Sequence, residues 1–120
     1  MNGKRLFIRP EEVETYIPGG HTGTVNRRLI GEDTVGAKNF EVVLGELNVG
    51  GAAHRHSHPD LEHGYYVLEG RCQIEVGEER QEVGPGMAVF VPPGVEHELN
   101  VIEPLKVLVF YSPPLNRVQQ

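Results

Sequence analysis

Glycine and proline interrupt this chain about every ten residues, and this spacing limits the fold more than any other feature. The two residue types contribute 15 and 9 of the 120 residues. Gly50-Gly51 and Glu69-Gly70, for example, are expected to end strands. The segments between such turns are short and rich in β-branched and aromatic side chains, as in a β-sandwich or barrel. We therefore predict a single all-β domain, since no linker or repeat divides the chain.

The positions of the predicted strands follow from these interruptions. Strands are expected over residues 24–30, 40–49, 65–68, 72–76, 87–91, 99–102 and 105–111. Cys72, Ile74 and Val76 alternate with polar residues, which indicates a strand with one buried face. Upstream, Pro10 followed by two glutamates predicts a short N-terminal helical turn. The polar tail over residues 116–120 is expected to fray.

Charge and cysteine content narrow the class of protein. Eleven basic residues against 17 acidic ones give a net charge of −6, which disfavours binding to nucleic acid or to anionic lipid. Cys72 is the only cysteine, so an internal disulfide is impossible and a reducing compartment fits. No apolar stretch is long enough for a signal peptide or a membrane span. We expect a soluble, cytoplasmic protein.

Histidines are concentrated in one short segment. His54, His56, His58 and His63 lie within ten residues of one another, and His97 follows a Pro-Pro-Gly turn. On a strand, histidines two residues apart place both rings on one face, roughly 7 Å apart at Cα, where both could bind one metal ion. His54 and His58 would be about 13 Å apart, so one ion cannot hold all three, and strand geometry alone leaves the choice of pair open. A lone His-x-His is more often a surface feature, but the additional histidines favour a metal site.

Two spaced motifs contain most of these histidines. In the first, five residues separate Gly50 from His56-Ser57-His58, and Gly70 closes the motif after the next strand. In the second, five residues separate Gly86 from Pro92-Pro93-Gly94, and two more precede His97.

Together the two motifs resemble those of the cupin superfamily, over about residues 40–111. The family's second motif ends in an Asn, but this chain has Val101 at that position. The resemblance implies a double-stranded β-helix, or jelly-roll barrel. It divides the chain into an N-terminal extension with outer strands (1–39), a barrel core (40–112) and a C-terminal tail (113–120).

The first motif departs from the usual pattern at its carboxylate position. Counting back from Gly70 places His63 there, while Glu62 lies one residue earlier. Adjacent residues on a strand face opposite sides, so only one of the two can reach an ion inside the barrel. We favour His63, which would share the inward face with Tyr65, and keep Glu62 as the alternative.

The resemblance then implies the subset of small cupins that hold a metal with four histidines, here His56, His58, His63 and His97. The cofactor would be one divalent transition metal per chain: Mn, Fe, Ni, Zn or Cu. His54 would be a residue outside the ligand set, at the mouth of the site or simply exposed.

The same resemblance implies a metalloenzyme acting on a small oxygen-rich or aromatic substrate. The expected chemistry is that of a dioxygenase or of an isomerase or lyase that cleaves C–C or C=C bonds. Tyr65, if it faces inward, could donate a proton or a hydrogen bond, although a role in packing is equally compatible. The alternative is a non-catalytic cupin that binds or senses a sugar or small organic acid. The family also implies a homodimer, consistent with apolar Tyr66 and Leu68 on the outer face.

Overall fold

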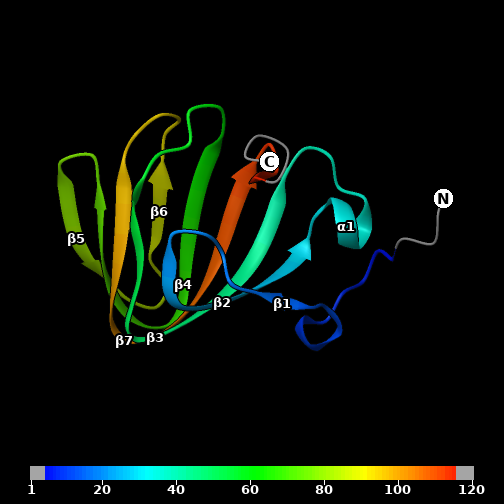
Figure 1. Cartoon of the computed structure of the whole chain (residues 1–120), viewed down its shortest axis with the longest axis horizontal. Coiled ribbons are helices and arrows are strands. Elements are labelled where there is room, and N and C mark those ends of the chain that lie inside the picture. The colour runs from blue at the N-terminus through cyan, green and yellow to red at the C-terminus, as the bar shows by residue number, and fades with distance from the viewer. Residues whose placement is uncertain (1–4, 116–120) are drawn as a thin grey trace.

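The computed structural model describes residues 5–115, so the predicted fraying of residues 116–120 lies outside the described part. The chain is built almost entirely of strands (Figure 1). In chain order the elements are η1 (Pro10–Glu12), β1 (Thr15–Tyr16), β2 (His21–Ile30), α1 (Glu32–Val35), β3 (Glu41–His56), β4 (Glu62–Val76), β5 (Glu79–Val83), β6 (Ala88–Val91) and β7 (His97–Ser112). The predicted N-terminal helical turn is the 3-10 turn η1. Within residues 5–115, no helix is long and apolar enough to cross a bilayer.

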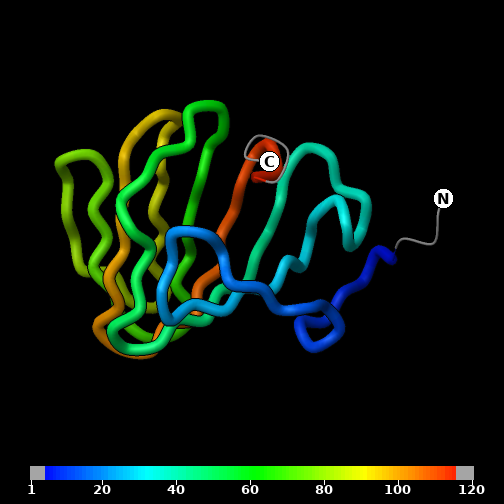
Figure 2. The backbone as a smooth tube through the Cα atoms, in the orientation of Figure 1, coloured from blue at the N-terminus to red at the C-terminus, as the bar shows by residue number. Residues whose placement is uncertain are grey.

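All strand pairs are antiparallel, and the sheet has the order β1-β2-β3-β7-β4-β5, with β6 also paired to β4. Three long strands dominate it: β3 and β7 have 16 residues each, and β4 has 15. β7 lies between β3 and β4 over nearly its whole length. The long strands curve, so the sheet folds back on itself into a barrel (Figure 2). The predicted all-β jelly-roll barrel is confirmed.

Three of the predicted strand breaks are wrong. β3 continues through Gly50-Gly51, β4 continues through Gly70, and β7 continues through the predicted gap before Leu105. Gly70 shows why a glycine there does not end the strand. Its φ is +87°, and a Cβ at this position would lie 1.9 Å from the carbonyl oxygen of Pro104. The glycine therefore lets two bent strands cross closely while their pairing continues on either side.

Three short elements, β1, α1 and β5, were not predicted; β5 is polar and buries only Val83. β1 has two residues and α1 has four, so neither is long enough to show a hydrophobic period. β2, in contrast, pairs with β3 from His21, opposite Ala53, to Ile30, opposite Val42. The N-terminal part of the chain is therefore hydrogen-bonded into the same sheet as the barrel core.

Inward-facing side chains of the long strands fill one end of the barrel. The alternation on β4 is clear, because His63, Tyr65 and Val67 are buried whereas Tyr66 and Leu68 are exposed. The apolar core comprises Val43, Leu47, Ala53, Leu61, Tyr65, Val67, Cys72, Ile74, Val83, Val91, Leu99, Val101, Leu105, Val107, Val109 and Tyr111. Burying one large apolar side chain stabilises a fold by about 1.5–3 kcal/mol, so this cluster is a main source of the barrel's stability.

Candidate metal centre

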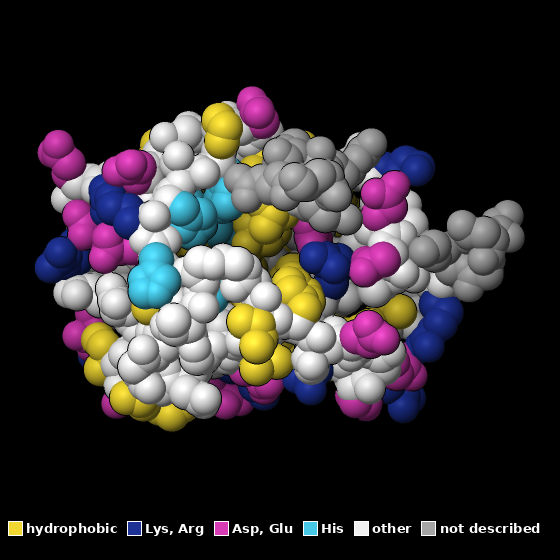
Figure 3. All heavy atoms as spheres, viewed as in Figure 1, with side chains coloured by type: hydrophobic (Ala, Val, Ile, Leu, Met, Phe, Trp, Pro, Cys, Tyr) yellow, Lys and Arg dark blue, Asp and Glu magenta, His cyan; other side chains and the backbone are white. Residues whose placement is uncertain are grey.

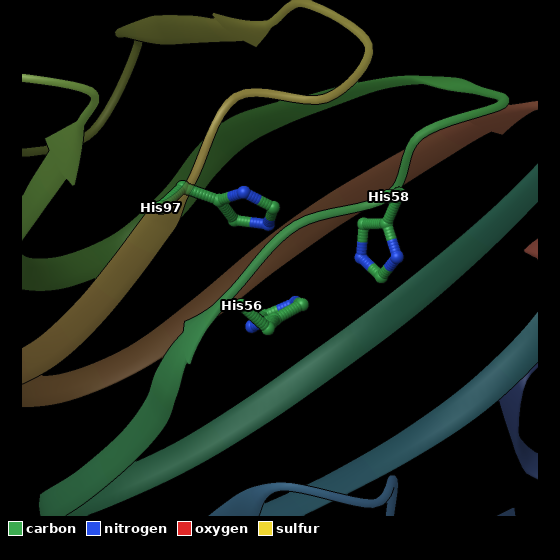
Figure 4. Close-up of side chains that lie close together, drawn as sticks. All are labelled: His56, His58 and His97. Carbon is green, nitrogen blue, oxygen red and sulfur yellow. The ribbon is translucent and has the colours of Figure 1, made fainter.

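Three histidines from two distant parts of the chain meet at the open end of the barrel. His56 ends β3, His58 lies two residues beyond it, and His97 begins β7 directly opposite His56. Their ligand nitrogens all lie within 4.8 Å of one another. Figure 4 shows the three imidazoles gathered around one space. The antiparallel pairing of β3 with β7 is what joins the two sequence motifs.

Backbone carbonyls orient two of these rings. Nδ1 of His56 lies 2.6 Å from the carbonyl oxygen of His54, and Nδ1 of His97 lies 3.0 Å from that of Val95. A carbonyl can only accept, so each Nδ1 carries the proton and each Nε2 presents its lone pair. Nε2 of His97 is buried and has no hydrogen-bond partner among the described residues. Such backbone-oriented tautomers are typical of metal-binding histidines.

His63 faces the same space from β4. Its ring centroid is 5.5 Å from that of His58 and 5.0 Å from that of His97, although its nitrogens fall outside the tight group of three. Its side chain is 3% exposed, and within the described chain neither ring nitrogen has a hydrogen-bond partner. Burial lowers the pKa of His63 well below its usual value, as do the neighbouring histidines. The ring is therefore neutral at pH 7, the form that binds metals.

Glu62 lies on the opposite side of β4. Its side chain is exposed, and Glu62, the first residue of β4, pairs with Ser112, the last residue of β7. Of the two residues considered for the carboxylate position, His63 is the one that faces the histidine cluster.

The donor set fits a divalent transition metal. A buried nitrogen without a hydrogen bond costs about 1–3 kcal/mol. Three such nitrogens lie at this cluster: Nε2 of His97 and both ring nitrogens of His63. A metal ion bound there would offset this cost. Imidazoles without a carboxylate suit Zn, Cu, Ni or Fe better than hard cations such as Mg or Ca.

His21 is a sixth histidine near this cluster that the sequence analysis did not identify. It begins β2, and its ring centroid is 6.5 Å from that of His56. Burial lowers its pKa to about 4, and the nearby His56, His54 and His97 contribute further. The register of β2 on β3 brings it here, and no local spacing in the sequence signals that register. His54 is exposed at the mouth of the site.

Two tyrosines contact His63 from different sides. Tyr65 belongs to the apolar core, and its ring centroid lies 4.6 Å from that of His63. The Tyr111 ring stacks on the His63 ring, with the two centroids 4.5 Å apart. It also lies edge-on to the His58 ring, with the centroids 6.0 Å apart. Tyr111 lines the pocket in front of the histidines as well. Burial raises the pKa of both phenols above the usual value, so both are protonated at neutral pH. The predicted inward orientation of Tyr65 holds, but Tyr111 is the phenol at the pocket.

An open pocket of about 560 Å³ lies in front of the histidines. In Figure 3, histidine side chains gather beside a hollow on this face of the molecule. The pocket is lined by Tyr16, Ile17, Pro18, Gly19, Gly20, His21, Asn26, Arg28, His54, Arg55, His56, Ser57, His58, Tyr111 and Leu115.

The family model of the cupin domain matches residues 43–111, which span both histidine motifs. The chain belongs to the cupin family. A relative from Streptomyces coelicolor, an uncharacterized protein, is 41% identical over 78 residues, which are 64% of this cupin and 73% of that protein.

Solved structures share the fold over most of the chain. The polyketide cyclase RemF from Streptomyces resistomycificus is 29% identical, with a TM-score of 0.79 over 90% of this cupin and 79% of RemF. An RmlC-like cupin from Shewanella frigidimarina has a TM-score of 0.82 over 98% of each chain, and at 22% identity this likeness shows the fold alone. Similar cupins thus include an enzyme.

Proposed function

We propose that this cupin holds one divalent transition metal through His56, His58, His63 and His97, and that it is a metalloenzyme for a small oxygen-rich or aromatic substrate. The observation that carries the proposal is the set of buried imidazole nitrogens around one space, with two rings oriented by backbone carbonyls. The adjoining pocket is large enough for a small molecule beside the ion.

A four-histidine set has a chemical consequence. Four neutral ligands leave the ion its full +2 charge, whereas a glutamate would reduce it to +1. A bound metal would therefore act as a strong Lewis acid toward a substrate oxygen, which suits dioxygenase chemistry or C–C and C=C bond cleavage. Nitrogen ligands favour Cu, Ni or Zn by intrinsic affinity, while Mn or Fe would depend on supply.

The two tyrosines support different roles in this proposal. Tyr111 lines the pocket and can donate its phenolic hydrogen to a bound molecule. Tyr65 contacts the His63 ring and is not among the residues that line the pocket, so its role is to hold His63 in place. The catalytic role predicted for Tyr65 is thus better supported for Tyr111.

A non-catalytic binding role is the second candidate. None of the described residues that line the pocket is Asp or Glu, so within residues 5–115 the pocket has no carboxylate to act as a general base. A cupin that binds a sugar or small organic acid without converting it needs no such base.

The homodimer is also a proposal, and the cytoplasmic location stays a prediction. Tyr66 is 40% exposed, Leu68 38%, Phe110 38% and Phe90 58%, all on the outer side of the sheet. A second copy covering this face would remove apolar surface from water. Light scattering should give twice the chain mass, and a monomer at micromolar concentration would contradict the dimer.

Metal analysis tests the main proposal. The purified protein, reconstituted with each candidate ion and dialysed, should retain about one ion per chain. Retention of no ion would refute it. Incubating the loaded protein with β-diketones, catechols and alkenyl arenes then separates the two candidates, because an enzyme consumes the compound and a binding protein returns it unchanged.

A further inference from the structure

The wall of the pocket carries basic groups on an otherwise acidic chain. Among the described lining residues, the titratable side chains apart from tyrosines are four histidines and two arginines: His21, His54, His56, His58, Arg28 and Arg55. The chain as a whole has a net charge of −6. His56 and His58 are neutral metal ligands in the proposed function, and Arg28 and Arg55 are the permanently charged groups that can bind an anion through their N–H donors.

Arg28 lies on the wall together with Asn26. It sits on β2 opposite Val43, whose side chain faces the interior, so Arg28 points into the barrel as well. Its side chain is 20% exposed. The guanidinium lies over the Tyr16 ring, 4.6 Å from the ring centroid, so one of its faces is covered.

Two carboxylates hold this guanidinium in a fixed orientation. Nε donates to Glu41, whose side chain is 1% exposed and also accepts the Leu115 N–H at 2.7 Å. Nη1 donates to Asp33 at 3.2 Å. Neither Glu41 nor Asp33 lines the pocket in front of the histidines, although Arg28 also borders a neighbouring pocket that Asp33 lines.

Three donors of Arg28 remain: the second N–H of Nη1 and both N–H groups of Nη2. Across residues 5–115, no hydrogen bond joins Nη2 to a protein acceptor. A planar guanidinium that is already oriented loses little entropy when it binds a carboxylate. The buried Glu41 therefore serves as a positioning residue for an anion-binding Arg28.

We infer that the pocket takes a small carboxylic acid, with a carboxylate on Arg28 and a second oxygen group at the histidine cluster. The second contact rests on the proposed metal function, whereas the contact with Arg28 does not. A dicarboxylate, or an acid with a hydroxyl or keto oxygen, is the simplest class with groups at both ends.

Calorimetry with succinate and its monoamide, succinamate, tests this inference. The two have nearly the same shape, but the amide removes one negative charge. We expect succinate to bind Zn-loaded protein at least about tenfold more tightly, a factor consistent with a charge-assisted hydrogen bond. Equal affinities would overturn the inference.

Variants identify the residue responsible. Arg28→Gln combined with Glu41→Gln removes both charges and leaves no buried carboxylate unpaired, and the preference for succinate should disappear. The matched control is Arg27→Gln combined with Glu46→Gln on the outer side of β2, where these two side chains pair at 3.1 Å. It removes the same two charges and should keep the preference. Loss of the preference in both variants would overturn the assignment to Arg28, and thermal unfolding checks that each variant is folded.

The same titrations without metal separate this inference from the proposed function. A preference for succinate that depends on Arg28 in metal-free protein supports the inference even if no metal binds. A protein that binds metal but shows no dependence on Arg28 refutes the inference and leaves the metal site standing.

Discussion

His56 at the end of β3 lies directly opposite His97 at the start of β7, with their ring centroids 4.3 Å apart. Each Nδ1 is held by a backbone carbonyl within two residues of its own ring. A metal ion bound by both Nε2 atoms would connect two strands that are distant in sequence. Metal binding should therefore stabilise the barrel as well as supply chemistry.

His97→Ala should abolish tight metal binding. The substitution removes one of the three convergent ligands, so retained metal should fall from about one ion per chain to near zero after dialysis. Elemental analysis measures this. His54→Ala is the matched control, because His54 is exposed and outside the ligand group, and it should retain the ion. A full complement of metal in His97→Ala would rule out this residue as a ligand.

The fourth ligand can be decided with a pair of neighbouring variants. His63→Ala should weaken metal affinity at least about tenfold, since even residues that only support metal ligands contribute that much. Glu62→Gln should leave the affinity unchanged, because Glu62 faces outward. Competition with a chelator gives both affinities. The reverse pattern would make Glu62 the ligand and reduce the charge left at the ion.

His21 should make the metal-free protein less stable in acid. Its pKa in the folded state is lowered to about 4, below the ordinary value of 6.5, chiefly by burial. Between these values the unfolded state binds more protons, so the free energy of unfolding should fall as pH decreases from about 6.5 to 4. Urea denaturation across this range should show a smaller fall in His21→Gln than in the wild type. Identical pH profiles would show that His21 is not responsible.

Gly70 and Gly86 should respond very differently to alanine. Both have φ of +87°, but a Cβ at Gly70 would overlap the Pro104 carbonyl, whereas nothing lies within 4 Å of one at Gly86. Gly86→Ala should cost about 1–2 kcal/mol, for the left-handed backbone alone. Gly70→Ala should cost about 3 kcal/mol or more, since the crossing strands must also move apart. Equal free energies of unfolding would contradict the close crossing.

The sequence predicted side-chain orientation correctly where a short-range period or a motif spacing indicated it. The period of two on β4 placed Tyr65 inside and Tyr66 outside, and the spacing from Gly70 pointed to His63. Sequence reasoning failed at Gly50-Gly51 and at Gly70 because a glycine in the left-handed region marks a turn and a bend within a strand equally well.

It also missed the residues that only the closure of the barrel brings to the site. Arg28 and His21 reach the pocket through the register of β2 on β3, and Tyr111 through the pairing of β7 with β4. In the sequence Arg28 and Tyr111 belong to ordinary strand patterns, and His21 lies before the strand predicted over residues 24–30.

Anomalous diffraction from crystals of the reconstituted protein, recorded at the absorption edge of the bound metal, is the most direct test of the metal site. The account predicts one peak at roughly 2.0–2.3 Å from Nε2 of His56, Nε2 of His97, and a nitrogen of His58 and of His63. A peak outside this cluster, or one bound by Glu62 in place of His63, would contradict the four-histidine centre.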